Sequence, residues 1–239
     1  MSTRRKSQII VALDTPQRDR ALELVRTLRG QVGLFKVGLE LYTSAGPSIV
    51  KDLKGLGAEV FLDLKFHDIP NTVARAVVEA ARLGAALTDL HLSGGAAMVR
   101  RAVDELKAVC DLHRIRRPAL LGITVLTSLG TEDLAGMGIA RSPEEQVLSL
   151  AEMGREAGLD GIVASARELP ALRKRFGPDW ILVTPGIRPE GSPADDQVRT
   201  LTPREAVEAG ADYLVIGRPI TGSPDPCAAA REILRSLLA

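Results

Sequence analysis

Four charged side chains near two short apolar runs could carry acid–base chemistry. Asp63 and Lys65 are two positions apart, so they would point to the same face of a strand. Asp68 follows in the next loop, and Lys36 ends another apolar run. A lysine between carboxylates stays protonated and can deliver its proton at a fixed point, while the carboxylates repel an anionic group. This arrangement suits the replacement of a departing carboxylate by a proton, without a nucleophile or an electron sink.

Two glycine–arginine segments in the C-terminal part of the chain could bind a phosphate group. Gly186-Ile187-Arg188 and Gly217-Arg218 each follow an apolar run. Glycine lets the backbone approach an anion closely, and a guanidinium matches a phosphate with two parallel hydrogen bonds. A simple turn with a solvated arginine is the alternative interpretation. The segment 188–200 is long and rich in Pro, Gly, Ser and Asp, which is typical of a lid over a site or of a disordered surface insertion.

Short apolar runs alternate along the chain with longer segments of helical periodicity. The runs are apolar at consecutive positions, as expected of parallel strands that are buried on both faces. The predicted strands are Ile9–Leu13, Leu34–Val37, Val60–Leu64, Ala86–Leu90, Ala119–Val125, Gly161–Ala164, Ile181–Thr184 and Tyr213–Ile216. The predicted helices are Asp19–Leu28, Thr72–Leu83, Ala97–Leu112, Glu144–Ala157, Glu168–Phe176 and Pro226–Leu238. Several of these helices are followed by a glycine that suits a left-handed cap.

Eight strands with helices between them, in 239 residues, predict an α/β fold of the (β/α)8 TIM-barrel type. The main alternative, a doubly wound open sheet, usually has a glycine-rich turn after its first strand, where this chain has Asp14-Thr15-Pro16. We therefore predict one catalytic barrel domain over residues 1–239. Barrel enzymes carry their catalytic residues at the C-terminal ends of the strands, where the charged residues above fall. An ion-pair network that only closes the barrel is the alternative, but buried charges are costly, so their clustering favours a functional site.

The composition excludes several classes of protein. Lys and Arg total 31 against 30 Asp and Glu, a net charge of +1, so there is no basic excess for nucleic acid or a membrane surface. Cys110 and Cys227 lie far apart and have no metal-ligand spacing, which favours a reduced protein. No stretch approaches the roughly 18 apolar residues of a membrane span, and the N-terminus lacks a signal-peptide pattern. We expect a soluble, cytoplasmic protein.

The run from Asp63 to Thr72 resembles the signature of the orotidine 5′-phosphate decarboxylase family. The family pattern is Asp-x-Lys-x-x-Asp followed by Ile-Pro-Asn-Thr, and this chain matches it throughout. Phosphosugar decarboxylases and aldolase-like relatives share the first part, but the full set of matching segments is specific. These further segments are Val11-Ala12-Leu13-Asp14, Lys36-Val37-Gly38, Ser93-Gly94-Gly95, Val125-Leu126-Thr127-Ser128, Val183-Thr184-Pro185-Gly186-Ile187-Arg188-Pro189 and Val215-Ile216-Gly217-Arg218-Pro219.

The resemblance implies the conversion of orotidine 5′-phosphate to uridine 5′-phosphate and CO2, the last step of de novo UMP biosynthesis, without metal or organic cofactor. It implies that Lys65 protonates C6 of the pyrimidine and that Asp63 lies against the departing carboxylate. Lys36 and Asp68 would complete the charge chain. In this family the second aspartate and the threonine of the motif reach across a dimer interface. Asp68 and Thr72 would therefore serve the neighbouring subunit's site in a homodimer.

The resemblance also implies which residues hold the rest of the nucleotide. They are Asp14 at the ribose, Thr127 at the pyrimidine edge, Gln197 between phosphate and base, and Gly217, Arg218 and Arg188 at the phosphate. By position alone, Asp14 could instead be the N-cap of the following helix, and Thr127 a helix-start residue.

Two other functions remain open from the residues. A metal-dependent phosphosugar lyase or decarboxylase on the same scaffold would need a carboxylate beside Asp63 to hold Mg²⁺, where this chain has Lys36. A non-catalytic nucleotide-binding protein would bind a 6-substituted uridine phosphate but leave orotate absorbance unchanged. A chelator and an ultraviolet assay would separate the three.

Overall fold

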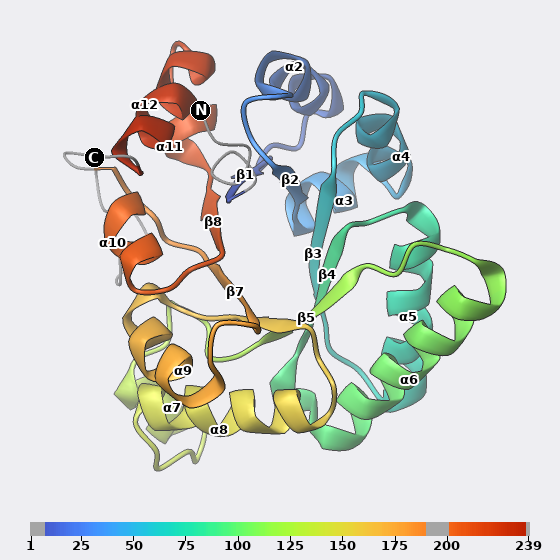
Figure 1. The fold of residues 1–239 in the computed structure, drawn as a ribbon. Helices are drawn as coiled ribbons and strands as arrows, with labels where there is room; N and C mark the ends of the chain where they lie inside the picture. The colour runs from blue at the N-terminus through green and yellow to red at the C-terminus, as the bar shows by residue number, and fades with distance from the viewer. Residues whose placement is uncertain (1–7, 190–200, 238–239) are drawn as a thin grey trace.

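Eight parallel strands close into a barrel in the computed structural model, which describes residues 8–189 and 201–237 (Figure 1). Each strand pairs with the next along the chain, and β1 pairs with β8 to complete the circle. The strands are β1 Ile9–Ala12, β2 Leu34–Val37, β3 Val60–Phe66, β4 Leu87–His91, β5 Ala119–Ile123, β6 Gly161–Val163, β7 Ile181–Thr184 and β8 Tyr213–Ile216. The predicted (β/α)8 barrel is confirmed, and all eight predicted strands are present with boundaries within two residues.

Helices surround the strands on the outside of the barrel (Figure 1). The six predicted helices correspond to α2 Arg18–Leu28, α5 Pro70–Leu83, α6 Ala96–His113, α8 Pro143–Glu156, α9 Leu169–Phe176 and α12 Pro226–Ser236. The sequence prediction missed shorter ones, which are α3 Leu39–Ala45, α4 Ser48–Gly55, α7 Thr131–Gly136, α10 Pro203–Glu208 and α11 Arg218–Thr221, together with the 3-10 turns η1 Leu92–Gly94 and η2 Ala166–Glu168. All of these except α4 have seven residues or fewer, which is two turns at most and too few to display a clear period.

Two apolar layers hold the barrel together. The larger layer lies between the strands and the helices, and the smaller one fills the barrel interior. The interior residues are Ile10, Ala12, Leu34, Phe61, Leu87, Leu121, Val183 and Val215. Because strand side chains alternate between the two faces, the residue two positions after an interior residue also points inward.

This alternation carries charged side chains into the C-terminal end of the barrel. Two positions after Leu34, Phe61 and Leu87, the chain has Lys36, Asp63 and Asp89 respectively. All three are buried in the folded chain. The adjacent strands β2, β3 and β4 therefore each place one ionisable group above the apolar interior, where catalytic residues of such barrels lie.

Candidate active site

A cavity of about 270 Å³ lies at the C-terminal ends of the strands. Its walls combine apolar residues of the barrel interior with residues that end a strand or follow one. Of the residues predicted for the site, eight line this cavity: Asp14, Lys36, Asp63, Lys65, Thr127, Arg188, Gly217 and Arg218. The structure thus brings together residues that are spread over most of the chain length.

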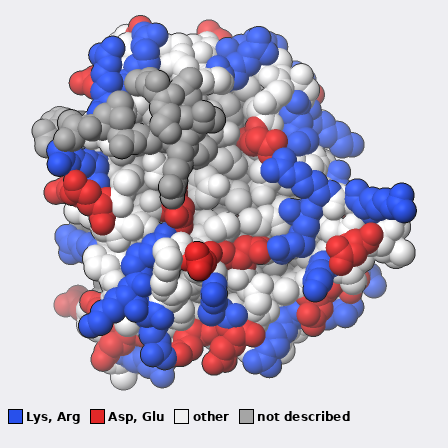
Figure 2. Space-filling model, in the orientation of Figure 1, with Lys and Arg blue, Asp and Glu red and all other residues white. Residues whose placement is uncertain are grey.

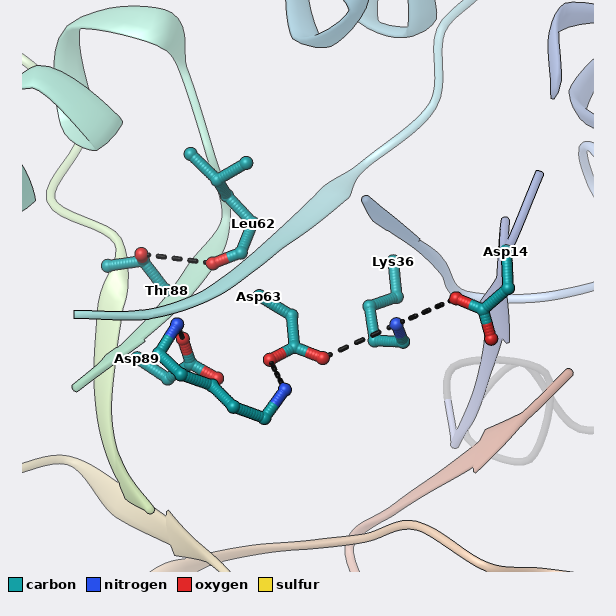
Figure 3. A network of polar contacts seen from close by, with 7 residues as sticks. Asp14, Lys36, Leu62, Asp63, Thr88 and Asp89 are labelled. Carbon is teal, nitrogen blue, oxygen red and sulfur yellow. Dashed lines mark hydrogen bonds and ion pairs between the residues drawn. The ribbon is translucent and has the colours of Figure 1, made fainter. Parts of the chain in front are cut away.

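Four of these side chains form a row of alternating charge, the charge row, which consists of Asp14, Lys36, Asp63 and Lys65. The Lys36 Nζ atom lies 3.1 Å from Asp14 Oδ1 and 3.3 Å from Asp63 Oδ2. The other oxygen of Asp63, Oδ1, lies 2.5 Å from Lys65 Nζ. Figure 3 shows the Lys36 ammonium between the Asp14 and Asp63 carboxylates. Asp63 is therefore held between two ammonium groups.

The central pair of the charge row is well shielded from solvent. The side chains of Lys36 and Asp63 are 11% and 10% exposed, against 31% for Lys65 and 58% for Asp14. Burial alone would raise the pKa of Asp63, but Lys36, a hydrogen bond with Asp89 and Lys65 together outweigh it and lower this pKa to about 2. Burial likewise works to lower the pKa of Lys36, but the Asp63 and Asp14 carboxylates outweigh it and raise this pKa above its usual value. Both groups are charged at neutral pH.

The backbone of β3 is irregular where it carries these charges. Leu62 pairs with Thr88 of β4, but the next pair is Phe66 with Leu90, so β3 bulges between Leu62 and Phe66. Lys65 has φ of 52°, in the left-handed region that non-glycine residues rarely occupy. The sequence prediction placed Lys65 on the same face as Asp63 by regular strand alternation. This placement is confirmed, since both residues line the cavity while Leu62 and Leu64 pack in the outer apolar layer, even though the pairing of β3 with β4 is irregular here.

Asp89 in β4 also lines the cavity and was missed by the sequence analysis. It is fully buried, and its Oδ1 accepts a hydrogen bond from the backbone N–H of Lys65 at 2.8 Å. Burial and the neighbouring Asp63 charge raise the pKa of Asp89 well above its usual range. A signal was present in the sequence, since a charged residue stood inside a predicted buried strand.

The structure excludes the helix-capping and helix-start alternatives for Asp14 and Thr127. Helix α2 has Gln17 as its N-cap, so Asp14 does not cap it and instead bonds Lys36. Helix α7 begins at Thr131 with Gly130 as its N-cap, so Thr127 does not start this helix. Both residues line the cavity.

Two predicted site residues lie outside the cavity of this chain, and a third lies outside the described residues. Asp68 and Thr72 are exposed, and Asp68 Oδ1 accepts a hydrogen bond from the N–H of Ile69 at 2.6 Å. The charge row within one chain thus includes Asp14, and Asp68 takes no part in it. That Asp68 and Thr72 serve a neighbouring subunit stays a prediction. Gln197 belongs to the residues 190–200, which the structure does not describe.

Charges on the surface around the cavity are mixed in sign. Figure 2 shows Lys and Arg side chains interspersed with Asp and Glu side chains over this face. Attraction of an anion therefore depends on cations placed locally in the cavity, such as Arg188 and Arg218. Across residues 8–189 and 201–237, no three His, Cys, Asp or Glu side chains are grouped to hold a metal ion. No helix in the described part of the chain combines the length and apolarity needed to cross a membrane.

A closed parallel barrel with ionised groups at its C-terminal mouth is the architecture of a (β/α)8-barrel enzyme. The model of the orotidine 5′-phosphate decarboxylase / HUMPS family matches residues 7–233. The chain therefore belongs to this family, whose decarboxylases are carboxy-lyases.

Curated relatives and solved structures agree with the family match. A Nitrosococcus oceani protein named orotidine 5′-phosphate decarboxylase is 52% identical over 228 residues, 95% of this chain and 96% of the relative. A protein of the same name from Pseudomonas aeruginosa strain LESB58 is 53% identical, covering 97% of this chain and 98% of the relative. The crystal structure of the Lactobacillus acidophilus orotidine 5′-phosphate decarboxylase is similar with a TM-score of 0.85 and 38% identity, covering 98% of this chain and 100% of that one.

Proposed function

We propose that this chain decarboxylates orotidine 5′-phosphate to uridine 5′-phosphate and CO2, without metal or organic cofactor, as the last step of UMP biosynthesis in the cytoplasm. The family match supports the reaction. The observation that carries the mechanism is the buried contact of Asp63 with two ammonium groups, those of Lys36 and Lys65, inside the cavity.

In the proposed step, the bond between C6 of the pyrimidine and its carboxylate breaks and CO2 departs. The bonding electrons stay on C6, which takes a proton from the ammonium of Lys65, and the lysine is reprotonated from solvent. The Lys65 side chain is more exposed than those of Lys36 and Asp63, so its ammonium can exchange protons with water. The positive charge of Lys65 also stabilises the negative charge that develops on C6.

Asp63 acts as a fixed negative charge beside the substrate carboxylate. Lys36 and Lys65 lower the pKa of Asp63 to about 2 against the opposing effect of burial, so it cannot relieve the repulsion by taking up a proton near neutral pH. The repulsion ends when CO2 leaves, so it raises the energy of the bound substrate relative to the transition state. Lys36 contributes by keeping Asp63 ionised in a buried place.

The remaining cavity residues hold the nucleotide in this proposal. Arg218 and Arg188 bind the phosphate together with the backbone at Gly217, Asp14 binds a ribose hydroxyl, and Thr127 contacts the pyrimidine edge. The support for this assignment is that all five line the same cavity as the charge row. Gln197, assigned between phosphate and base, lies outside the described residues.

A homodimer is part of the proposal, with Asp68 and Thr72 of one subunit acting at the site of the other. In the single chain both side chains are exposed, although they follow β3, which carries Asp63 and Lys65 of the charge row. Two large apolar side chains, Leu39 after β2 and Ile69 after β3, are 58% and 68% exposed. Exposed apolar residues at adjacent strand ends suit a surface that a second copy covers.

The experiment is an ultraviolet assay of orotidine 5′-phosphate consumption by the purified protein with EDTA present. We expect turnover that is insensitive to EDTA. In Lys65→Ala, kcat should fall by about 10²–10⁴-fold, the usual contribution of a positioned acid. Binding of uridine 5′-phosphate should persist, because the phosphate contacts lie elsewhere in the cavity.

Lys107→Ala, which removes an exposed lysine of α6, is the matched control and should keep wild-type turnover. Loss of turnover in EDTA would favour the metal-dependent lyase. Nucleotide binding without consumption would favour a binding protein. Near-normal turnover in Lys65→Ala would refute the proton-donor role.

A further inference from the structure

Asp89 is a fully buried carboxyl group in the cavity that the proposed reaction does not use. It lies on the inward face of β4, beside the charge row (Figure 3). Its Oδ1 accepts the backbone N–H of Lys65 at 2.8 Å. Its side chain also lies next to the Asp63 carboxylate, which helps to raise the pKa of Asp89. A buried ionisable residue where leucine or valine would pack well calls for a role.

The backbone that Asp89 bonds is strained. Among the described residues, the non-glycine residues with positive φ are Lys65 and Arg114. Arg114 forms the left-handed C-cap of α6, a common place for this conformation. Lys65 instead lies within β3, where the left-handed conformation costs about 1–2 kcal/mol. Such a conformation persists only when its surroundings hold it.

The bulge in β3 explains why a side chain must supply the hydrogen bond. The β3–β4 pairing is regular up to Leu62 and resumes at Phe66, so the residues between them leave the ladder. The N–H of Lys65 falls in this interval and is satisfied by the Asp89 carboxyl. At the other end of the same residue, Lys65 Nζ meets Asp63 Oδ1. Lys65 is thus fixed at its backbone by one aspartate and at its ammonium by another.

We propose that Asp89 is the positioning residue of Lys65: its carboxyl oxygen stabilises the left-handed backbone that directs the Lys65 ammonium to Asp63 and into the cavity. This inference rests on the proposed role of Lys65 as proton donor. In this proposal Asp89 acts through Lys65.

The role requires an acceptor oxygen and does not require a negative charge. Burial and the Asp63 charge raise the pKa of Asp89, which favours its neutral form. An asparagine at this position keeps a carbonyl oxygen in the same place, whereas alanine and valine keep none. The asparagine variant should therefore retain the function that the other two lose.

The test compares kcat and KM for orotidine 5′-phosphate in Asp89→Ala, Asp89→Asn and the wild type. In Asp89→Ala we expect kcat to fall by about 10–100-fold, since a displacement of the donor by about 1 Å costs up to 100-fold, with KM changed by less than about threefold. In Asp89→Asn we expect kcat within about fivefold of the wild type. Asp89→Val is a second acceptor-free variant that suits a buried strand, should the alanine protein fail to fold.

Thr88→Val is the matched control, since Thr88 is the preceding residue of β4 and is also fully buried. Its Oγ1 donates to the Leu62 carbonyl at 3.1 Å, so the variant loses one β3–β4 hydrogen bond without touching Lys65. We expect a lower melting temperature with kcat preserved. A loss of kcat in Thr88→Val equal to that in Asp89→Ala would overturn the proposal. It would show that the loss of any hydrogen bond between β3 and β4 lowers kcat.

A crystal structure of the acceptor-free variant gives a readout that does not depend on activity. We expect Lys65 to leave the left-handed region and its ammonium to move from Asp63. An unchanged Lys65 backbone, or wild-type kcat in Asp89→Ala, would overturn the positioning role. If the wild type does not consume orotidine 5′-phosphate, the proposed function fails, while the crystal structure still decides whether Asp89 holds Lys65.

Discussion

Asp63 and Asp89 are neighbouring buried carboxyl groups whose environments shift their pKa values in opposite directions. Burial works to raise the pKa of both, but Asp63 lies between Lys36 and Lys65, which lower its pKa to about 2. In Asp89, burial and the adjacent negative charge of Asp63 act together and raise the pKa. One carboxyl is therefore kept as an anion and the other is favoured as a neutral hydrogen-bonding group. Such divergent pairs are typical of catalytic sites.

The raised pKa of Asp89 predicts a pH-dependent effect of Asp89→Asn on stability. The folded state binds the Asp89 proton more tightly than the unfolded chain, where the pKa is near 3.8. The resulting stabilisation is complete below about pH 3.8 and is lost as the pH rises through the folded pKa. Asparagine does not titrate. The melting temperature of Asp89→Asn, relative to the wild type, should therefore increase from about pH 4 upward in thermal unfolding followed by circular dichroism.

The control for this measurement is Asp104→Asn, which changes an exposed aspartate of α6 and should show no comparable trend. A difference between Asp89→Asn and the wild type that stays constant, or decreases, between pH 4 and pH 9 would contradict the assignment of a neutral Asp89.

At the scale of elements, β3 and β6 each contain a position with an unusual backbone requirement, for different reasons. In β3 the bulge turns Lys65 into the cavity and serves the site. In β6 the first residue, Gly161, pairs with Ile181 of β7, and a Cβ atom there would collide with the Ile181 carbonyl oxygen. The backbones of β6 and β7 approach each other too closely for a side chain at this position.

Gly161→Ala is therefore expected to destabilise the barrel by about 1–3 kcal/mol, the usual cost of overpacking a filled interior. For a chain of this size, this corresponds to a fall of about 2–4 °C in melting temperature per kcal/mol. Gly136→Ala at the end of α7 is the matched control, because a Cβ atom there meets nothing within 4 Å. The control should be neutral or slightly stabilising. Equal melting temperatures of the two variants would show that β6 and β7 can separate without cost.

At the scale of the whole molecule, one chain holds most of the proposed site but not all of it. The cavity and the charge row are complete within the barrel, whereas Asp68 and Thr72 are exposed outside the cavity. In the proposed homodimer, each subunit supplies its Asp68 and Thr72 to the cavity of the other subunit. In a two-fold dimer, the same exchange occurs twice and gives two equivalent sites.

Mixing two inactive variants tests this exchange. Lys65→Ala and Asp68→Ala are each expected to lose turnover alone. When they are unfolded and refolded together in equal amounts, half of the dimers are mixed, and each mixed dimer holds one site with both residues intact. We therefore expect recovery of about a quarter of the wild-type activity. If Asp68 acts within its own chain, no mixture regains activity, and the exchange is refuted.

The fold was largely predictable because its signals are local. Consecutive apolar residues marked all eight strands, and periodic segments marked the longer helices, since burial and backbone period are properties of neighbouring residues. The break at Gly46-Pro47 divides the helical stretch between β2 and β3 into α3 and α4. Most of the missed helices have seven residues or fewer, which is too short to display a helical period.

The sequence by itself determined which strand ends carry Lys36, Asp63, Lys65 and the two glycine–arginine segments, since these positions follow from the order of elements. Only the tertiary structure decided the rest. It paired Asp14 with Lys36 instead of with a helix N-terminus, and it placed the Asp89 carboxyl where it accepts a hydrogen bond from the backbone N–H of Lys65. The physical reason is that hydrogen bonds between strands and a left-handed backbone depend on partners more than twenty residues away, which no local pattern specifies.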